Sequence, residues 1–318
     1  MNKLNVAIIG FGLIGKKRYL NLYKSNLVSI CEKKKLEKNF TKYQCSANKI
    51  FKDASIDVVI ISTSHSSLYK LALSALEGGK HVFVEKPGAL SFKNLRELIK
   101  FAEKKKLVFF VGYNLRFHPA IAKAKELVQK KVIGELMYLK ISYGHGGRLN
   151  YGSEWRFNKK ISGGGELIDK GSHLIDLSTM FLGRFSKFYS NLKNYYWHSK
   201  LDDNCFLILE NSKKQVAFLH ASSTEWKNEF KLEVYGKLGK IKVTGIGRSY
   251  GNEKCIYYKM YKKMGPPKII EYDYSKLKDI SWKKEMKLFY NLIKLKKFKI
   301  KKNYDHLMVI KTINSIYQ

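Results

Sequence analysis

The sequence predicts two folds in series: an α/β fold with a doubly wound parallel sheet, followed by an α+β domain with an open, mainly antiparallel sheet. Short apolar runs alternate with helical stretches through the first 117 residues, as in parallel strands joined by crossover helices. After Pro119 the alternation ends, and strand-like runs follow one another without helices between them. At 318 residues the chain is long for a single core. We therefore expect domains at residues 1–117 and 118–318.

The first domain is expected to contain a buried parallel sheet. Its strands are predicted at residues 4–9, 27–32, 57–63, 81–85 and 107–112, all short and apolar as in a sheet covered on both faces. Helices are predicted at residues 15–24, 66–77 and 91–105. In the last of these, Leu95, Ile99 and Ala102 recur at a spacing near 3.6 residues, which places them on one buried face.

The second domain is expected to begin with a helix and continue mainly as strands. The first elements are a helix at 120–130, a strand at 136–143 and a glycine-rich loop at 144–152. Another helix starts within residues 163–165 and ends near Leu182. Strands follow at 205–209, 215–222, 231–235, 240–243 and 255–261, and helices near 281–295 and 305–317 close the chain. For the last helix, packing back on the N-terminal domain is the alternative.

Composition limits the location and the partners of the protein. The formal net charge is +35, yet only seven of the 61 basic residues are arginine. Specific base recognition favours the bidentate arginine fork, so the dispersed lysines predict a solvated surface and no specific nucleic-acid partner. No apolar stretch reaches the roughly 18 residues of a membrane span, and the four cysteines are far apart. We expect a cytoplasmic protein with reduced thiols and no membrane partner.

A glycine motif lies between the first predicted strand and the first predicted helix. Gly10 allows a tight turn, Gly12 lets the backbone approach a pyrophosphate, and Gly15 lets helix and strand pack closely. The helix starts here, so backbone N–H groups at Leu13 and Ile14 are available to phosphates. The motif therefore predicts a Rossmann dinucleotide-binding domain.

The end of the second strand bears on the choice of dinucleotide. Glu32 follows Gly15 by 17 positions. A carboxylate there accepts hydrogen bonds from the ribose hydroxyls of NAD and repels the 2′-phosphate of NADP. Lys33 and Lys34 come next and would neutralise that phosphate. NAD is the expected cofactor, and NADP is the alternative.

Polar residues also follow the third and fourth strands, where the cofactor crevice of such a sheet lies. Thr63 and His65 end the third strand, and His65 is either a contact of the nicotinamide ribose or a polar residue at the lip. Glu85 and Lys86 end the fourth strand. We expect all four to border the cofactor, with the Lys86 ammonium able to hold and polarise a substrate hydroxyl.

The segment GGGELIDKGSHLID supplies a second set of ionisable groups. On a helix, Asp169, His173 and Asp176 fall on one face. His173 can take a hydroxyl proton near neutral pH, and Asp169 can orient it or bind a second hydroxyl. The alternatives are a solvated helix face with a paired histidine, and a metal site. Because hydride transfer to a nicotinamide needs no metal, we expect none.

The motifs together resemble those of the glucose–fructose oxidoreductase/inositol dehydrogenase (Gfo/Idh/MocA) family. GFGLIG, GGKHVFVEKP, GYNLRFHPA and SGGGELIDKGSHLID occur in the family's order and cover essentially the whole chain. The resemblance implies an NAD(P)-dependent sugar or cyclitol dehydrogenase with Lys86 and His173 as the catalytic pair and Asp169 beside them. It also implies a cis peptide bond before Pro87 and a homo-oligomer, dimer or tetramer, formed through the second sheet. One departure is TSHSSL in place of the TPNxxH of many members, with Leu68 where they have histidine.

The substrate side of the site is expected in the second domain. Arg116, His145, Arg148 and Lys227 are candidates for holding a phosphate or carboxylate, each with an ordinary ion pair inside the fold as the alternative. The predicted substrate-binding residues are Arg116, His145, Arg148, Tyr151, Trp155, Asp169 and His173.

The sequence therefore predicts reversible oxidation of a secondary hydroxyl on a sugar, nucleotide-sugar or cyclitol. An NAD-dependent glycosidase and a non-catalytic dinucleotide-sensing regulator are the alternatives on the same fold. A nucleic-acid or membrane binder is suggested by charge alone, and an anionic substrate would also benefit from that charge.

Overall fold

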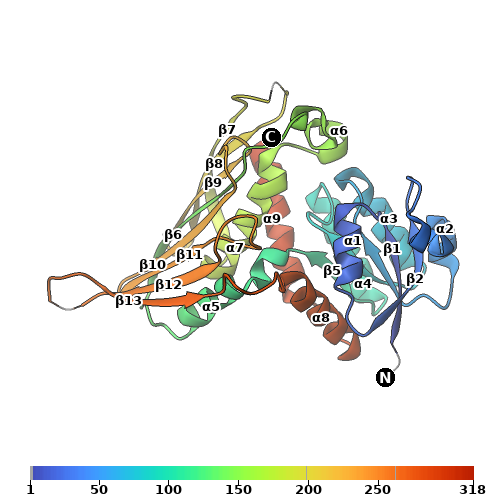
Figure 1. Ribbon diagram of the computed structural model, residues 1–318, viewed down its shortest axis with the longest axis horizontal. Helices are drawn as coiled ribbons and strands as arrows, with labels where there is room; N and C mark the ends of the chain where they lie inside the picture. Colours follow the sequence, from blue (N-terminus) through green and yellow to red (C-terminus); the bar gives the residue numbers. More distant parts are fainter. Residues whose placement is uncertain (1–2, 198, 262) are drawn as a thin grey trace. The chain divides into compact units, whose positions relative to one another are not determined.

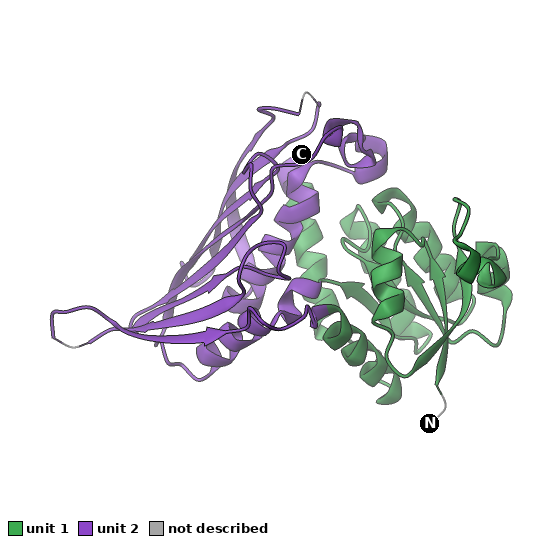
Figure 2. Ribbon diagram, in the orientation of Figure 1, with its two compact units in different colours: residues 1–113, 282–314 green, residues 114–281, 315–318 purple. Residues whose placement is uncertain are grey.

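The computed structural model describes residues 3–197, 199–261 and 263–318. The chain divides into two compact units (Figure 1, Figure 2). Unit 1 comprises Met1–Tyr113 and Trp282–Asn314, and unit 2 comprises Asn114–Ser281 and Ser315–Gln318. The chain first changes unit close to the predicted boundary at residue 117. The predicted second domain extends to residue 318, with packing of the last helix on the N-terminal domain as the alternative; residues 282–314, which hold most of that helix, lie in unit 1.

Unit 1 is built on a five-stranded parallel sheet, which confirms the predicted Rossmann fold. The strand order is β2-β1-β3-β4-β5, and every neighbouring pair is parallel. The strands are β1 (Leu4–Ile9), β2 (Ser25–Cys31), β3 (Val58–Ile61), β4 (His81–Glu85) and β5 (Phe109–Gly112). Because β1 lies between β2 and β3, the order reverses at β1, and the carboxyl ends of all three strands meet there.

Helices pack on this sheet, most of them through apolar side chains, whereas the buried residues of α1 are Gly15 and Arg18. They include α1 (Leu13–Leu20), α3 (His65–Glu77), α4 (Phe92–Lys104), α8 (Ser281–Lys294) and α9 (Lys301–Tyr317). In α4 the buried residues include Leu95, Ile99 and Ala102, as their spacing predicts, and the Ser91 hydroxyl caps the first turn. The Asn303 amide donates to the Phe109 carbonyl oxygen at 2.7 Å, which anchors α9 to the end of the sheet.

Unit 2 is built on an eight-stranded sheet in the order β13-β12-β11-β10-β6-β9-β8-β7. Among the neighbouring pairs of this sheet, β6·β9 is parallel and the other six are antiparallel, so the predicted open, mainly antiparallel sheet is confirmed. The strands are β6 (Leu136–Gly144), β7 (Phe185–Lys193), β8 (Asn204–Asn211), β9 (Val216–Ser222), β10 (Glu229–Gly236), β11 (Gly239–Thr244), β12 (Lys254–Lys259) and β13 (Lys268–Asp273).

In the described part of the chain, one face of this sheet carries helices. Helices α5 (Pro119–Gln129) and α7 (Ser172–Leu182) pack on it (Figure 1). Along β8 and β9, side chains that face the helices are buried, and those that alternate with them are half-buried or exposed. The outer face carries Ile208, Phe218 and a stacked pair of Phe206 and His220. The sheet therefore leaves an apolar area on the side away from its helices.

Several elements were not predicted from the sequence. They are α2 (Ala47–Lys52), α6 (Lys159–Ser162), the edge strands β7 and β13, and a π-helical turn, η5 (Leu167–Gly171). Almost every residue of β7 is exposed, so this strand lacks the apolar alternation that indicates a strand with one buried face. The π-turn precedes α7 without a break and is invisible to a spacing argument that assumes 3.6 residues per turn.

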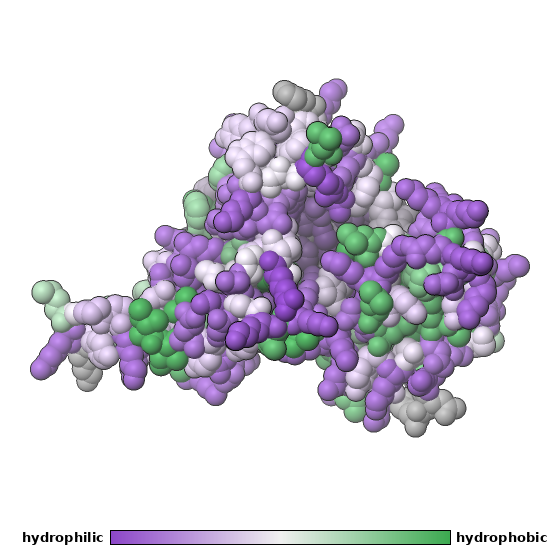
Figure 3. Space-filling model, in the orientation of Figure 1, coloured by the Kyte–Doolittle hydropathy of each residue, from purple (hydrophilic) through white to green (hydrophobic). Residues whose placement is uncertain are grey.

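The described residues contain no helix that is long and apolar enough to cross a membrane. Hydrophilic residues cover most of the visible face of each unit (Figure 3). This distribution agrees with lysines that are dispersed along the chain rather than gathered in one segment.

Candidate functional site

The glycine loop after β1 forms a cradle in unit 1. Gly10 has a φ of +86°, and a side chain there would meet the carbonyl oxygen of Ser62 at 2.7 Å. A side chain at Gly15 would collide with the Gly10 carbonyl oxygen. At Gly12, by contrast, an added Cβ would find no atom within 4 Å. Gly10 and Gly15 therefore serve local packing, whereas Gly12 faces open space that a ligand can approach.

The start of α1 suits an anion at this open space. Gly12 provides no side-chain cap for the helix, and its first turn contains no acidic residue. The backbone N–H groups of Leu13 and Ile14 lie in that first turn, before intrahelical bonding begins. The cradle fits the pyrophosphate of a dinucleotide, because the N–H groups and the helix dipole both favour negative charge.

Glu32 lies directly beside the glycine loop. Its Oε2 accepts a hydrogen bond from the Phe11 backbone N–H at 2.6 Å, and its Oε1 accepts from the Lys33 and Lys34 N–H groups at 2.7 and 3.2 Å. The side chains of Lys33 and Lys34 are exposed. The carboxylate is therefore fixed next to the cradle, where the adenosine ribose of a bound dinucleotide would be recognised.

The end of β3 borders the same loop of unit 1, and β4 pairs with β3 on the side away from β1. The Ser62 hydroxyl donates to the Gly10 carbonyl oxygen at 2.7 Å, which ties the segment with Thr63 to the glycine loop. His65 is buried at the start of α3. The Lys86–Pro87 peptide bond is cis, as the family resemblance implied.

A buried arginine that the sequence interpretation missed holds Glu85. Arg18 has no exposed surface, and its guanidinium bonds to Glu85 Oε1 (Nε, 2.6 Å) and to Glu285 Oε2 (Nη1, 2.7 Å). It also lies 4.3 Å from the ring centroid of Phe83 and 4.4 Å from that of Trp282. Arg18 therefore links the cofactor helix α1 to the residue before Lys86. The sequence feature that could have revealed this role is the presence of an arginine on the helix that begins at the glycine motif.

In the triad of Arg18, Glu85 and Glu285, burial and ion pairing shift the pKa values of Arg18 and Glu285 in opposite directions. Burial lowers the pKa of Arg18, but Glu85 and Glu285 outweigh it and leave that pKa above the ordinary value. Burial raises the pKa of Glu285 to about 7, although Arg18 opposes the rise. One guanidinium thus serves two carboxylates, Glu285 fully buried and Glu85 largely so.

The helical segment of unit 2 keeps His173 buried and separates Asp169 from Asp176. Asp169 lies in the π-turn η5, and His173 and Asp176 lie in α7. Asp176 forms a bidentate pair with Arg116, at 2.7 Å to Nε and 2.6 Å to Nη2, with both side chains buried. For Arg116 the structure therefore shows the alternative named from the sequence, an ordinary ion pair inside the fold, and the partner in that pair is Asp176.

Asp169 belongs to a charged network on the other side of the π-turn. Arg156 Nε lies 3.4 Å and Lys170 Nζ 3.8 Å from its Oδ2. Lys170 is buried and donates to Glu166 at 2.8 Å. Burial lowers the pKa of Lys170, but Glu166 and Asp169 outweigh it and keep the lysine cationic. The sequence interpretation named Asp169 only. The ionisable neighbours Glu166 and Lys170 within the same motif were the missed signal.

The loop after β6 carries the remaining predicted substrate residues. The hydroxyl of buried Tyr151 donates to Glu166 at 3.3 Å and lies 3.3 Å from His145 Nε2. Burial and then Lys170 lower the pKa of His145 to about 3, so this ring is neutral at physiological pH. Tyr143, at the end of β6, lies with its ring centroid 6.2 Å from that of His173. Tyr151 of the loop thus contacts Glu166, the residue before η5, and Tyr143 of β6 contacts His173 of α7.

The predicted anion-holding residues are not equivalent in the structure. Arg148 pairs with Glu154 at 2.5 Å, and Arg156 pairs with the same carboxylate at 3.1 Å. The Arg156 guanidinium lies over the Trp155 ring, 4.9 Å from its centroid. Lys227 is exposed on the loop after β9. Both arginines of the loop are therefore engaged by a carboxylate.

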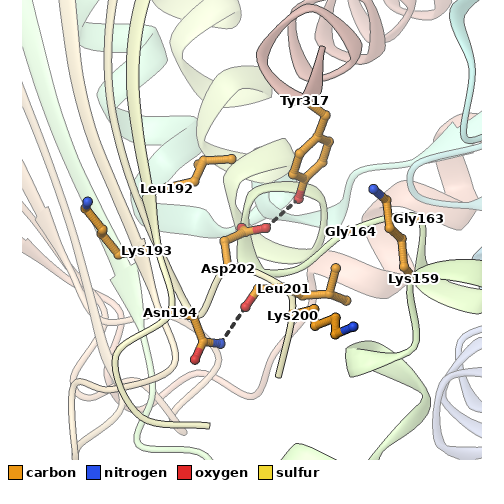
Figure 4. Close-up of a pocket in the computed structure, with 10 residues that line it drawn as sticks. All are labelled: Lys159, Gly163, Gly164, Leu192, Lys193, Asn194, Lys200, Leu201, Asp202 and Tyr317. Carbon is orange, nitrogen blue, oxygen red and sulfur yellow. Dashed lines mark hydrogen bonds between the residues drawn. The ribbon is translucent and has the colours of Figure 1, made fainter. Parts of the chain in front are cut away.

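A pocket of about 250 Å³ lies at the start of this helical segment (Figure 4). Asp202 accepts from the N–H groups of Gly165 and Leu167 at 3.2 and 2.7 Å and from the Tyr317 hydroxyl at 2.9 Å. Burial raises the pKa of Asp202 to about 6. The pocket is lined by Lys159, Gly163, Gly164, Leu192, Lys193, Asn194, Lys200, Leu201, Asp202 and Tyr317. Asp202 serves to cap the turn that carries Asp169.

Within residues 3–197, 199–261 and 263–318, no group of three or more histidine, cysteine, aspartate or glutamate side chains is arranged to hold a metal ion. The cradle, the carboxylate at the end of β2 and the five-stranded sheet instead define a dinucleotide-binding protein of the Rossmann class.

Comparison with known families specifies this class. Residues 4–113 match the model of an oxidoreductase family with an NAD-binding Rossmann fold, and residues 121–242 match the GFO/IDH/MocA C-terminal domain. Together the two matches cover more than half of the chain. The chain belongs to the GFO/IDH/MocA family of oxidoreductases.

Curated relatives include several dehydrogenases. Levoglucosan dehydrogenase of Pseudarthrobacter phenanthrenivorans is 33% identical over 139 residues, which cover 43% of this chain and 36% of that protein. Trans-1,2-dihydrobenzene-1,2-diol dehydrogenase of Xenopus laevis is 27% identical, over 58% of this chain and 54% of that protein. The scyllo-inositol 2-dehydrogenase (NADP(+)) IolW of Bacillus subtilis is 24% identical, over 74% and 68%. The chain thus matches only about a third to a half of the length of the first two.

Solved structures share the fold over nearly the whole chain. Levoglucosan dehydrogenase in complex with NADH and L-sorbose superposes with a TM-score of 0.86 at 21% identity, covering 99% of this chain and 96% of that one. Aldose-aldose oxidoreductase from Caulobacter crescentus, complexed with glycerol, gives a TM-score of 0.85 at 20% identity, covering 99% and 97%. At these identities the likeness establishes the fold.

Proposed function

We propose that this chain is an NAD(H)-dependent oxidoreductase that interconverts a secondary hydroxyl and a ketone on a sugar, nucleotide-sugar or cyclitol. The observation that carries the proposal is the open space at Gly12, next to the uncapped start of α1 and the fixed carboxylate of Glu32. Membership of an NAD-binding oxidoreductase family supports the cofactor. The names of the relatives, which include dehydrogenases of levoglucosan and scyllo-inositol, support the substrate class.

In the proposed mechanism each polar residue has one task. When bound, the nicotinamide supplies or accepts the hydride at C4. His173 removes the hydroxyl proton, and the Lys86 ammonium holds the reacting oxygen. Asp169 accepts a hydrogen bond from a neighbouring hydroxyl, and its ion pairs with Arg156 and Lys170 hold the carboxylate in place. Thr63, His65 and Glu85 border the cofactor, and residues 1–117 and 118–318 provide mainly cofactor and substrate contacts respectively.

The proposal extends to assembly and location. The outer face of the unit 2 sheet exposes 39% of Ile208 and 46% of Phe218, and a second copy of the chain would cover this area in a dimer or tetramer. Cys31, Cys45, Cys205 and Cys255 are free thiols, which fits a reducing compartment and hence the cytoplasm.

The test is a titration of the purified protein with NADH and NADPH, followed by energy transfer from tryptophan to the reduced nicotinamide. We expect tighter binding of NADH, and turnover with at least one member of a panel of sugars, nucleotide-sugars and cyclitols. Glu32→Ala should reduce the preference for NADH about tenfold, whereas Lys33→Ala, the matched control, should leave NADH affinity unchanged. Failure of folded protein to bind either nucleotide would overturn the proposal.

A further inference from the structure

Three loops that carry aromatic residues leave the unit 2 sheet at one edge. In the register of the sheet, the last residue of β6, Gly144, pairs with the last residue of β9, Ser222. Ser222 pairs with Asn204 at the start of β8, and Asn204 pairs with Lys193 at the end of β7. The segments 145–158, 194–203 and 223–228 therefore begin side by side, next to the candidate substrate site.

Four aromatic residues of these loops form a continuous series, here called the aromatic wall: Tyr151, Trp197, Tyr196 and Trp226. The ring centroids of Tyr151 and Trp197 are 5.3 Å apart, those of Trp197 and Tyr196 5.0 Å, and those of Tyr196 and Trp226 4.8 Å. Tyr151 is buried, Tyr196 is 49% exposed and Trp226 is 63% exposed. The wall therefore runs from the protein interior to solvent.

The middle of the aromatic wall is held rigidly by Asp203. Its buried carboxylate accepts hydrogen bonds from the consecutive backbone N–H groups of Tyr195, Tyr196 and Trp197, at 2.8–3.2 Å. The Trp197 indole N–H donates to the Ser223 carbonyl oxygen at 2.9 Å. At the base of the loop, the Asn194 side chain bonds to the Leu201 carbonyl oxygen at 2.6 Å (Figure 4). Much of the entropy of ordering these rings is therefore lost on folding rather than on binding.

The two tryptophans of the wall pack closely against glycines of the loop at residues 144–152. A side chain at Gly147 would collide with the Trp197 ring, and one at Gly146 would meet the Trp226 backbone at 2.7 Å. Trp226 has a φ of +53°, a conformation that costs free energy for a bulky residue. An exposed tryptophan kept in such a backbone indicates a surface that is built for contact.

The inner end of the wall reaches the network around Asp169. Tyr151 bonds to Glu166, which bonds to Lys170, and Lys170 lies 3.8 Å from Asp169. A ring held at Asp169 would thus have the wall as its continuation toward solvent. Aromatic faces flanked by polar groups suit the apolar faces of sugar rings and leave the hydroxyls free to form hydrogen bonds.

The charges beside the wall favour an uncharged occupant. Arg148 and Arg156 both pair with Glu154, and Arg156 and Lys170 pair with Asp169. The arginines of this loop are therefore neutralised by carboxylates, although the whole chain carries +35. A phosphate or carboxylate on the second ring would find both arginines of the loop already paired, and the cations left to it would be exposed lysines such as Lys227 beside Trp226.

We propose that the aromatic wall is a subsite for a second, uncharged sugar ring, so that the preferred substrate is a glycoside or disaccharide whose other ring reacts. The inference rests on the proposed function for the reacting ring, but the second-ring site lies wholly within unit 2. Trp226 and Tyr196 would stack on the second ring, and Asp203 would keep them in place.

The test compares sugars of one and two rings by isothermal titration calorimetry of the NADH-saturated protein. The probes are glucose, maltose, cellobiose, lactose and UDP-glucose. We expect at least one disaccharide to bind more tightly than glucose, and Trp226→Ala to weaken that disaccharide about tenfold while glucose affinity changes less than twofold. Trp226→Phe should restore most of the loss. Tyr189→Ala, at an exposed tyrosine of β7 outside the wall, is the matched control and should change neither affinity.

Four outcomes would overturn the inference, and a fifth would overturn only the proposed function. The first three are disaccharides that bind no more tightly than glucose, equal losses for both sugars in Trp226→Ala, and a Trp226 effect confined to UDP-glucose, which would indicate a nucleobase. A lower mass of Trp226→Ala in sedimentation would show that the wall covers a contact between copies. If the protein binds the disaccharide in a Trp226-dependent manner but binds no NADH, the subsite stands and the proposed function fails.

Discussion

The cofactor cradle of unit 1 and the charged network of unit 2 are organised in different ways. In the cradle, the recognising groups are backbone N–H groups and one carboxylate, placed by a short strand–turn–helix segment. Around Asp169, Arg156, Lys170 and Glu166 are mutually paired side chains, and their geometry depends on a π-turn and a long loop. A site made from local backbone is therefore readable as a sequence motif, whereas a site made from paired charges depends on the whole fold.

The largest expected effect concerns the ion-paired triad of Arg18, Glu85 and Glu285. This part of unit 1 depends on paired side-chain charges, as the network of unit 2 does. Arg18→Met would leave Glu85 and Glu285 buried without their cation, and should lower the free energy of unfolding by about 3–5 kcal/mol. Urea denaturation measures the change, with the exposed Arg96→Met as the matched control, expected to change stability by less than about 0.5 kcal/mol. Equal, small losses in both variants would show that the triad contributes little.

Next in size are the proposed catalytic groups, one from each unit. His173→Ala and Lys86→Ala should each lower turnover at least about 100-fold, because a proton acceptor or an oxygen-holding cation is lost. NADH binding, followed by fluorescence, should stay within a few-fold of the wild type. Normal turnover in either variant would remove that residue from the mechanism.

A smaller effect is expected in the pH dependence of stability. The pKa of Glu285 is raised in the folded protein to about 7, so folding favours its protonated form. Its contribution is fully present below the unfolded pKa and is lost as pH rises through about 7. Thermal unfolding should therefore show that the wild type loses stability relative to Glu285→Gln between about pH 4.5 and 7. Parallel curves for the two proteins would contradict the assignment.

The smallest and most discriminating effect separates two glycines of the cradle. Gly12→Ala places its methyl group in open space, so the protein should keep its stability while NADH affinity falls about tenfold. Gly15→Ala collides with the Gly10 carbonyl oxygen and should lower both stability and NADH affinity. Thermal unfolding and NADH titration of both variants measure this difference. Unchanged NADH affinity in Gly12→Ala would show that the pyrophosphate does not bind in the open space at Gly12.

The amino-acid sequence by itself determined the parallel sheet, the inner strands of the second sheet and the glycine loop. Buried parallel strands such as β3 are apolar throughout, and the spacing of Leu95, Ile99 and Ala102 defines a helix face, so local pattern and final structure agree. The same holds for Gly10, Gly12 and Gly15, because their roles arise within one strand–turn–helix segment.

Tertiary structure alone decided how the charges are used. Asp169 and Asp176 fall on one face of a regular helix, but the π-turn separates them into different networks. Arg18 meets Glu285 across 267 positions of sequence, and Asp203 orders an aromatic loop that no motif marks. A buried charge is stable only beside its partner, and that partner can come from any part of the chain. Sequence periodicity reports which face of an element is buried, but it carries no information about distant partners.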